Sequence, residues 1–148
     1  MVAPNLAASA TLYDTDETAW LDQTAELVRD RRLAEVDLDT LAEYLTDMAR
    51  RDRREVGSRL ALILAHLLKW EFQPDKRTGS WRATIEVQRQ ELAELLESGT
   101  LRNHADEVLA KAYANGVRQA AAETGLDATA FPAECPYMVK QLMSIDPE

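Results

Sequence analysis

The feature that most constrains the fold is a long segment without proline, from Leu38 to Phe72. Its apolar residues recur at spacings of three and four: Leu38, Leu41, Leu45, Met48, Val56, Leu60, Ile63, Leu67 and Trp70. This spacing predicts an amphipathic helix. Gly57 lies within the segment and costs about 1 kcal/mol relative to Ala in a helix interior. We therefore expect one long helix with a possible kink near Gly57, and the alternative is two helices that meet there.

Helical spacing of apolar residues also appears on both sides of this segment. The expected helices run from Asp14 to about Arg31, from Trp81 to Ser98, from Leu101 to Gly125, and from Pro136 to Leu142 or Met143. Capping signals support these ends, because Asp14 resembles the start of a capping box, Ser80 suits an N-cap, and Gly125 suits a left-handed cap. No segment shows the alternation of period two that strands require. The sequence predicts an all-α bundle of about four to five helices.

The length of 148 residues is typical of one domain. We expect a single helical domain over residues 13–148, after a flexible tail over residues 1–12 that lacks the pattern of a signal peptide. Cys135 is the only cysteine, so an intrachain disulfide is impossible and a reducing, cytoplasmic location is expected. The most apolar run, Leu60 to Leu68, is much shorter than the roughly 20 residues that cross a bilayer, so no membrane segment is expected.

Charge is distributed unevenly along the chain. The formal net charge is −9, yet the segment from Arg50 to Arg89 carries +5 and the remainder −14. The simpler interpretation is that the basic middle lies beside acidic helices of the same molecule. The alternative is a basic surface for nucleic acid, whose candidates are Arg50, Arg51, Arg54, Lys76 and Arg77. The overall acidic balance disfavours this alternative, because it repels a polyanion.

Several linked motifs resemble a known family. They are Ala65-His-Leu-Leu-Lys-Trp70 with Gln73-Pro74, Ser80-Trp-Arg-Ala-Thr-Ile85, Phe131-Pro132, and Glu134-Cys-Pro-Tyr137. Together they resemble the bacterial all-helical family catalogued as domain of unknown function twenty-nine, over nearly the whole chain. The resemblance implies an all-helical fold and no agreed activity, so it provides no catalytic residues. Where the family typically has a glutamate-rich stretch before Asp-Met-Gly, this chain reads Glu43-Tyr-Leu-Thr-Asp-Met-Ala49.

Polar residues interrupt the apolar face of the long helix. Asp52, Arg59 and His66 are seven residues apart, so they fall close to one line on a straight helix. Glu55 lies one turn before Arg59, and Arg82 and Gln88 occupy a similar position on the next helix. One interpretation is a polar pocket in which Arg59 and Arg82 hold an anion and His66 transfers a proton. The preferred interpretation is a structural hydrogen-bond network that fixes helix register.

Other chemistry has weaker support. Cys135, His66 and His104 lack the spacing of a zinc site, and no Glu-x-x-His repeat of a carboxylate di-metal bundle is present, so neither metal nor cofactor is expected. Cys135 precedes Pro136 at an expected helix start, where the helix dipole could lower a thiol pKa, but we favour a packing role for it. The chain also lacks a phosphate-binding glycine loop, a nucleophile elbow and a dinucleotide fingerprint. Whether the chain is an enzyme stays open.

These observations favour a cytoplasmic helical module that binds another protein or associates with itself. A nucleic-acid-associated factor that uses the basic middle is the second hypothesis. An enzyme with a polar pocket around Arg59 and His66 is the third.

Overall fold

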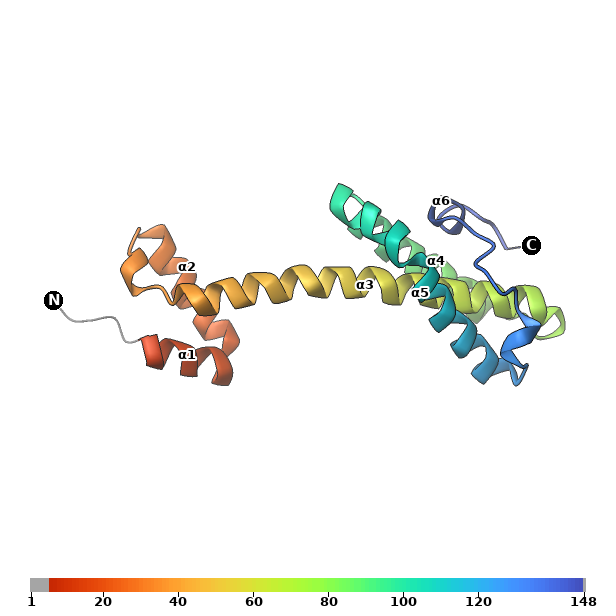
Figure 1. Cartoon of the computed structure of the whole chain (residues 1–148), viewed down its shortest axis with the longest axis horizontal. Coiled ribbons are helices and arrows are strands. Elements are labelled where there is room, and N and C mark those ends of the chain that lie inside the picture. Colours follow the sequence, from red (N-terminus) through yellow and green to blue (C-terminus); the bar gives the residue numbers. More distant parts are fainter. Residues whose placement is uncertain (1–5, 148) are drawn as a thin grey trace. The chain divides into compact units, whose positions relative to one another are not determined.

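The structure is a computed structural model that describes residues 6–147, and in that range it is all-α (Figure 1). Its elements are α1 (Leu6–Thr15), α2 (Glu17–Arg29), η1 (Leu33–Glu35), α3 (Leu38–Phe72), η2 (Pro74–Lys76), α4 (Gly79–Leu95), α5 (Gly99–Thr124), η3 (Ala128–Ala130) and α6 (Val139–Leu142). This confirms the all-α prediction and the single long helix, because α3 runs through Gly57 without interruption. Among these helices, none has both the length and the apolar content needed to cross a membrane.

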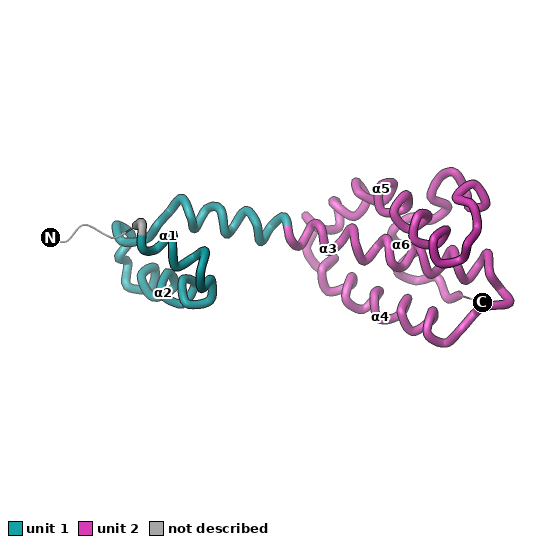
Figure 2. Tube along the Cα trace, turned by 90° about the horizontal axis from the view of Figure 1, so that it is seen from below, with its two compact units in different colours: residues 1–50 teal, residues 51–148 magenta. Residues whose placement is uncertain are grey.

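The chain divides into two compact units, Met1–Arg50 and Arg51–Glu148 (Figure 2). We refer to them as unit 1 and unit 2. The long helix α3 begins in unit 1 and ends in unit 2. The predicted single domain over residues 13–148 remains a prediction, since two compact units can belong to one domain.

Unit 1 is built around Trp20, which α2 places at zero exposure. The indole Nε1 donates a hydrogen bond of 3.1 Å to the hydroxyl of Ser9 on α1. The ring meets Tyr13 edge-on at 4.9 Å between centroids and Tyr44 of α3 at 5.9 Å. Among the described residues of this unit, Thr24 and Val36 are the other buried ones. A single tryptophan therefore ties α2 to both α1 and the start of α3.

The tail predicted over residues 1–12 needs correction from Leu6 onward, where the chain is helical. Residues 1–5 of that prediction lie outside the described part of the chain. Helix α1 has no strong amphipathic pattern, and alanine together with the contacts of Ser9 and Tyr13 to Trp20 accounts for its order. The next helix begins later than predicted: its N-cap is Asp16, whose carboxylate accepts from the Ala19 amide at 3.1 Å.

Unit 2 is organised around the second half of α3, which α4 and α5 cover. The buried residues of this half are Val56, Leu60, Ile63, Leu64, Ala65, Leu67, Leu68 and Lys69. The backbone of α5 approaches α3 most closely at Gly116. A Cβ at this position would lie 3.0 Å from the Leu64 Cβ and 3.1 Å from the Ala61 carbonyl oxygen. Only glycine therefore permits this helix contact without displacement.

The ends of α4, α5 and α6 differ in how well the sequence predicted them. Gly125 caps α5 with φ of 76°, which confirms the left-handed cap. Thr78, rather than Ser80, caps α4 by accepting from the Trp81 amide at 3.3 Å. Helix α6 begins at Val139 instead of Pro136, because the Gln141 side chain accepts from the Met138 amide at 2.8 Å and fixes the start there.

Gly57 and Gly116, which lie in the interiors of α3 and α5, provide a matched pair of substitutions. Gly116→Ala should lower the free energy of unfolding by about 1–3 kcal/mol, because the new methyl group pushes α5 away from α3. Gly57→Ala meets only a Val108 methyl at 3.7 Å, so it should raise that free energy by up to about 1 kcal/mol through helix propensity. Denaturant unfolding followed by circular dichroism measures both. Equal effects of the two substitutions would contradict the close approach at Gly116.

Candidate functional site

Arg59 is the centre of the first polar cluster of unit 2. Its Nε and Nη2 donate to Glu55 Oε1 on the same helix, at 3.0 and 2.6 Å. Its Nη1 donates to Gln88 Oε1 on α4 at 2.9 Å, and Glu91 Oε2 lies 3.7 Å from Nη2. The Arg59 side chain is 22% exposed. The guanidinium thus joins α3 to α4.

These contacts use three of the five N–H donors of the Arg59 guanidinium, so that each of its nitrogens donates to Glu55 or Gln88. A bound anion would compete with these partners and meet the repulsion of two nearby carboxylates, Glu55 and Glu91. The arrangement therefore fits a structural network that sets the register of α3 and α4 better than an anion pocket.

The structure does not bring Asp52, His66 and Arg82 to this cluster. Asp52 is exposed. Arg82 donates to Asp146 at 2.8 Å, and both of these side chains are largely exposed. His66 is half-buried, with Nδ1 at 2.9 Å from the Leu62 carbonyl oxygen. Residues seven apart drift by about 20° per heptad around a straight helix, so a line in the sequence does not define one pocket.

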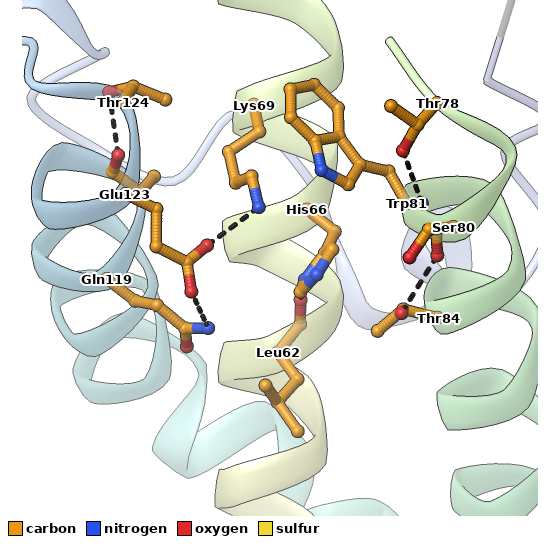
Figure 3. Close-up of polar contacts among 11 residues, drawn as sticks. Leu62, His66, Lys69, Thr78, Ser80, Trp81, Thr84, Gln119, Glu123 and Thr124 are labelled. Carbon is orange, nitrogen blue, oxygen red and sulfur yellow. Dashed lines mark hydrogen bonds and ion pairs between the residues drawn. The ribbon is translucent and has the colours of Figure 1, made fainter. Parts of the chain in front are cut away.

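A second cluster lies around Lys69, which is 7% exposed (Figure 3). Its Nζ donates to Glu123 Oε2 on α5 at 2.7 Å and lies 4.5 Å from the ring centroid of Trp81 on α4. Gln119 donates to the other Glu123 oxygen at 3.1 Å. One ammonium group therefore connects α3, α4 and α5.

The Lys69 ammonium also favours the ionised form of Glu123. The hydrogen bond from Lys69 lowers the pKa of the Glu123 carboxyl from its ordinary value, against the opposing effect of burial, and Gln119 and the charge of His66 lower it further. The sequence prediction missed this pair because 54 residues separate its members. One feature of the sequence did indicate that Lys69 is buried. It follows the buried Ala65 by four residues, on the same face of α3, at the end of the apolar run.

The tryptophans of unit 2 are covered by basic side chains. Lys69 lies over Trp81, and the Arg77 guanidinium lies 4.9 Å from the Trp70 ring centroid. Arg77 also donates from Nε to the Trp70 carbonyl at 2.8 Å. A nucleobase could stack on either of these ring faces only by displacing the cation. The other members of the proposed basic surface are exposed: Arg50, Arg51, Arg54 and Lys76.

Arg89 is a buried arginine that the sequence did not single out as buried. It is 8% exposed, its Nε donates to the Leu142 carbonyl at 2.7 Å, and burial lowers its pKa. Its Nη2 has no hydrogen-bond partner among the described residues. The sequence could have indicated this burial, because Arg89 lies at helical spacing between Ile85 and Leu92, and all three are buried on α4. The contact holds α6 against α4.

Cys135 does not have the environment of an activated thiol. Burial raises the pKa of its thiol, and the Tyr137 carbonyl accepts from Sγ at 3.3 Å. The helix that was expected to begin beside it begins at Val139 instead. The pKa of the Tyr137 hydroxyl is raised to about 12, first by burial and then by the 3.0 Å hydrogen bond that it donates to Glu71. Both groups stay protonated at neutral pH, which fits a packing role.

The first half of α3 exposes part of the apolar pattern from which the sequence predicted an amphipathic helix. Leu38 and Leu45 are 60% and 58% exposed. Ala42 and Ala49 are exposed as well, and the four residues follow each other at spacings of four, three and four. We call them the α3 stripe. The neighbouring face of the helix points inward, since Tyr44 meets Trp20 while Leu41 and Met48 are half-buried. The α3 stripe is an exposed apolar helix face.

Comparison with known proteins identifies a family. The family model described as domain of unknown function DUF29 matches residues 12–146. This match confirms the resemblance that the linked motifs carried. No curated protein and no solved structure matches the chain. Among residues 6–147, no group of three or more His, Cys, Asp or Glu side chains is placed to hold a metal ion.

The Lys69–Glu123 pair predicts a specific pH dependence. Because the folded pKa of Glu123 is lowered, its carboxylate stabilises the fold above the ordinary Glu pKa of about 4.3. That stabilisation disappears as the pH falls through the folded pKa. Glu123→Gln should therefore be less stable than wild type at pH 7, by at most about 1 kcal/mol because solvent screens a carboxylate this exposed.

The difference between the two proteins should shrink as the pH falls below the ordinary Glu pKa. Urea unfolding at several pH values measures it. In a Lys69→Met background, which lacks the ammonium donor, the same Glu123→Gln substitution should have little pH-dependent effect. A pH-dependent difference that persists in this background would assign the effect to another group.

Proposed function

We propose that this chain, which belongs to the family described as domain of unknown function DUF29, is a protein-interaction module that binds its partner through the α3 stripe. The observation that carries the proposal is the exposure of Leu38 and Leu45 on one face of a helix whose adjacent face is covered. Single exposed apolar residues are normal on protein surfaces. Four in register along a helix form a surface that a second helix can cover.

The small core of unit 1 supports the same interpretation. Among its described residues only Trp20, Thr24 and Val36 are buried, and Val28 and Leu33 are exposed in addition to the α3 stripe. A unit of this size is marginally stable when it buries so little apolar surface. A partner helix on the stripe would add apolar burial where the unit lacks it.

Charge favours a protein partner over nucleic acid at this surface. Residues 1–50 contain eleven Asp or Glu and four Arg. Asp39, Glu43 and Asp47 are exposed on the same helix as the stripe. Such a surface repels phosphates and attracts a partner with basic residues beside its apolar ones. In unit 2 a cation already lies over one face of Trp70 and of Trp81, so nucleic acid has less support there too.

The proposal includes weak binding of the partner and a cytoplasmic location for the chain. From Leu38 to Ala49 a helix rises about 16 Å, which gives a small contact of the transient class. The single cysteine, Cys135, is consistent with a reducing compartment. The enzyme hypothesis has less support, because each nitrogen of Arg59 already donates to Glu55 or Gln88, and Asp52 and Arg82 are exposed.

A charge placed on the stripe should remove the interaction. Leu38→Glu with Leu45→Glu should leave the helix intact, because both side chains are more than half exposed and glutamate forms helices well. Val87→Glu on α4 is the matched control, since Val87 is 51% exposed. Proteins that co-purify with the tagged chain, including untagged copies of it, are quantified by mass spectrometry.

Wild type and Val87→Glu should retain at least one protein that the double variant loses about tenfold or more, the loss expected when a contact worth about 1.4 kcal/mol is removed. If the three chains retain the same proteins in the same amounts, the α3 stripe is not an interaction surface.

A further inference from the structure

We infer that unit 1 binds an uncharged small molecule, with an apolar body and a hydroxyl or carbonyl group, in a cleft between α1, α2 and the segment from η1 to Asp37. The cleft has a volume of about 420 Å³. Small-molecule sites in proteins have volumes of roughly 300–1,000 Å³. The lining residues that the structure describes all belong to unit 1. The α3 stripe does not line this cleft, so the inference does not depend on the proposed function.

The walls of the cleft offer an apolar surface from three elements. Leu12 of α1, Leu27 of α2 and Val36, which follows η1, line it. An apolar ligand body in the cleft would remove these side chains from water, which favours binding. Because few side chains of unit 1 are buried otherwise, a ligand that fills the cleft would also stabilise this unit.

Thr24 provides a polar contact inside the cleft. It lines the cleft although the residue is only 7% exposed. Within residues 6–147 its hydroxyl forms no hydrogen bond. Among the same residues, Arg89 Nη2 is the one fully buried side-chain nitrogen or oxygen without a partner, so the Thr24 hydroxyl is not sealed from solvent. This hydroxyl is therefore available to a ligand in the cleft, and it can donate to the ligand or accept from it.

The charged groups at the cleft already have partners within the protein. Arg32 donates from Nε and Nη2 to the two carboxylate oxygens of Glu35, at 2.5 and 2.7 Å. Asp37 accepts from the amide and the hydroxyl of Thr40, at 3.2 and 2.6 Å. A charged ligand would therefore lose water in the cleft without gaining an unpaired counter-ion. An uncharged ligand avoids this cost, and a hydroxyl or carbonyl group matches the hydroxyl of Thr24.

A series of alkyl probes of equal chain length that differ in the head group tests the ligand class. 1-Octanol is uncharged, octanoate is an anion and octylammonium is a cation. Each is titrated into the full chain below its micelle concentration, and the backbone amides are followed by heteronuclear NMR. We expect 1-octanol to shift the amides of Ser9, Thr24 and Val36 saturably and to leave those of unit 2 unchanged. Octanoate and octylammonium should bind at least about fivefold more weakly.

Substitutions of Thr24 test its hydroxyl. Thr24→Val removes the hydroxyl and nearly keeps the side-chain volume, so it should weaken the binding of 1-octanol about threefold to tenfold, as expected when one hydrogen bond is lost. Thr24→Ser keeps the hydroxyl and should restore most of the affinity. Thr18→Val is the matched control, because Thr18 is exposed on the same helix and does not line the cleft. It should bind 1-octanol as wild type does. Circular dichroism checks that each variant is folded.

Several results would overturn the inference. If no amide of the cleft shifts up to the solubility limit of 1-octanol, or if octanoate or octylammonium binds as tightly, the cleft is not a site for an uncharged ligand. Equal binding by wild type and Thr24→Val would show apolar partitioning without the polar contact. Shifts confined to residues 38–49 would place 1-octanol on the α3 stripe, which overturns the inference while the proposed function stands.

Discussion

The structure depends on how α3 is covered along its length. A helix of 35 residues needs tertiary contacts for most of its stability, and the two halves of α3 obtain them differently. The second half is enclosed by α4 and α5, and α5 approaches so closely that Gly116 has no room for a side chain. The first half is held on one face by Trp20 and Tyr44 and exposes Leu38 and Leu45 on another. The candidate function follows from this difference.

Charged side chains inside unit 2 join helices instead of forming a pocket. Arg59 links α3 to α4, Lys69 links α3 to α4 and α5, and Arg89 links α4 to the segment that carries α6. The acidic partners are Glu55, Glu91 and Glu123 of the same chain. For Arg59 and Lys69, this agrees with the simpler interpretation of the basic middle, in which basic side chains lie beside acidic ones of the same molecule.

Helical spacing was sufficient to predict the all-α fold and the full extent of α3, because strong periodicity and the absence of proline act locally. The Gly125 cap was predictable for the same reason. Two features depended on contacts between helices and were missed: Lys69 is buried because Glu123 lies on another helix, and α1 is ordered beside Trp20. The start of α6 was also missed, although the contact that fixes it, between Gln141 and the Met138 amide, is local. The apolar pattern of Leu38 and Leu45 indicated a helix face, but it could not tell a core from a surface that awaits a partner.

Hydrogen exchange with and without the co-purifying protein tests the central claim most directly. The backbone amides of residues 38–49 are followed by mass spectrometry in the wild-type chain, with the α3 amides of residues 60–68 as an internal reference. If a protein partner covers the α3 stripe, the first set should exchange more slowly when the partner is present, while the reference set stays unchanged. Exchange of residues 38–49 that is the same with and without the partner would contradict the account.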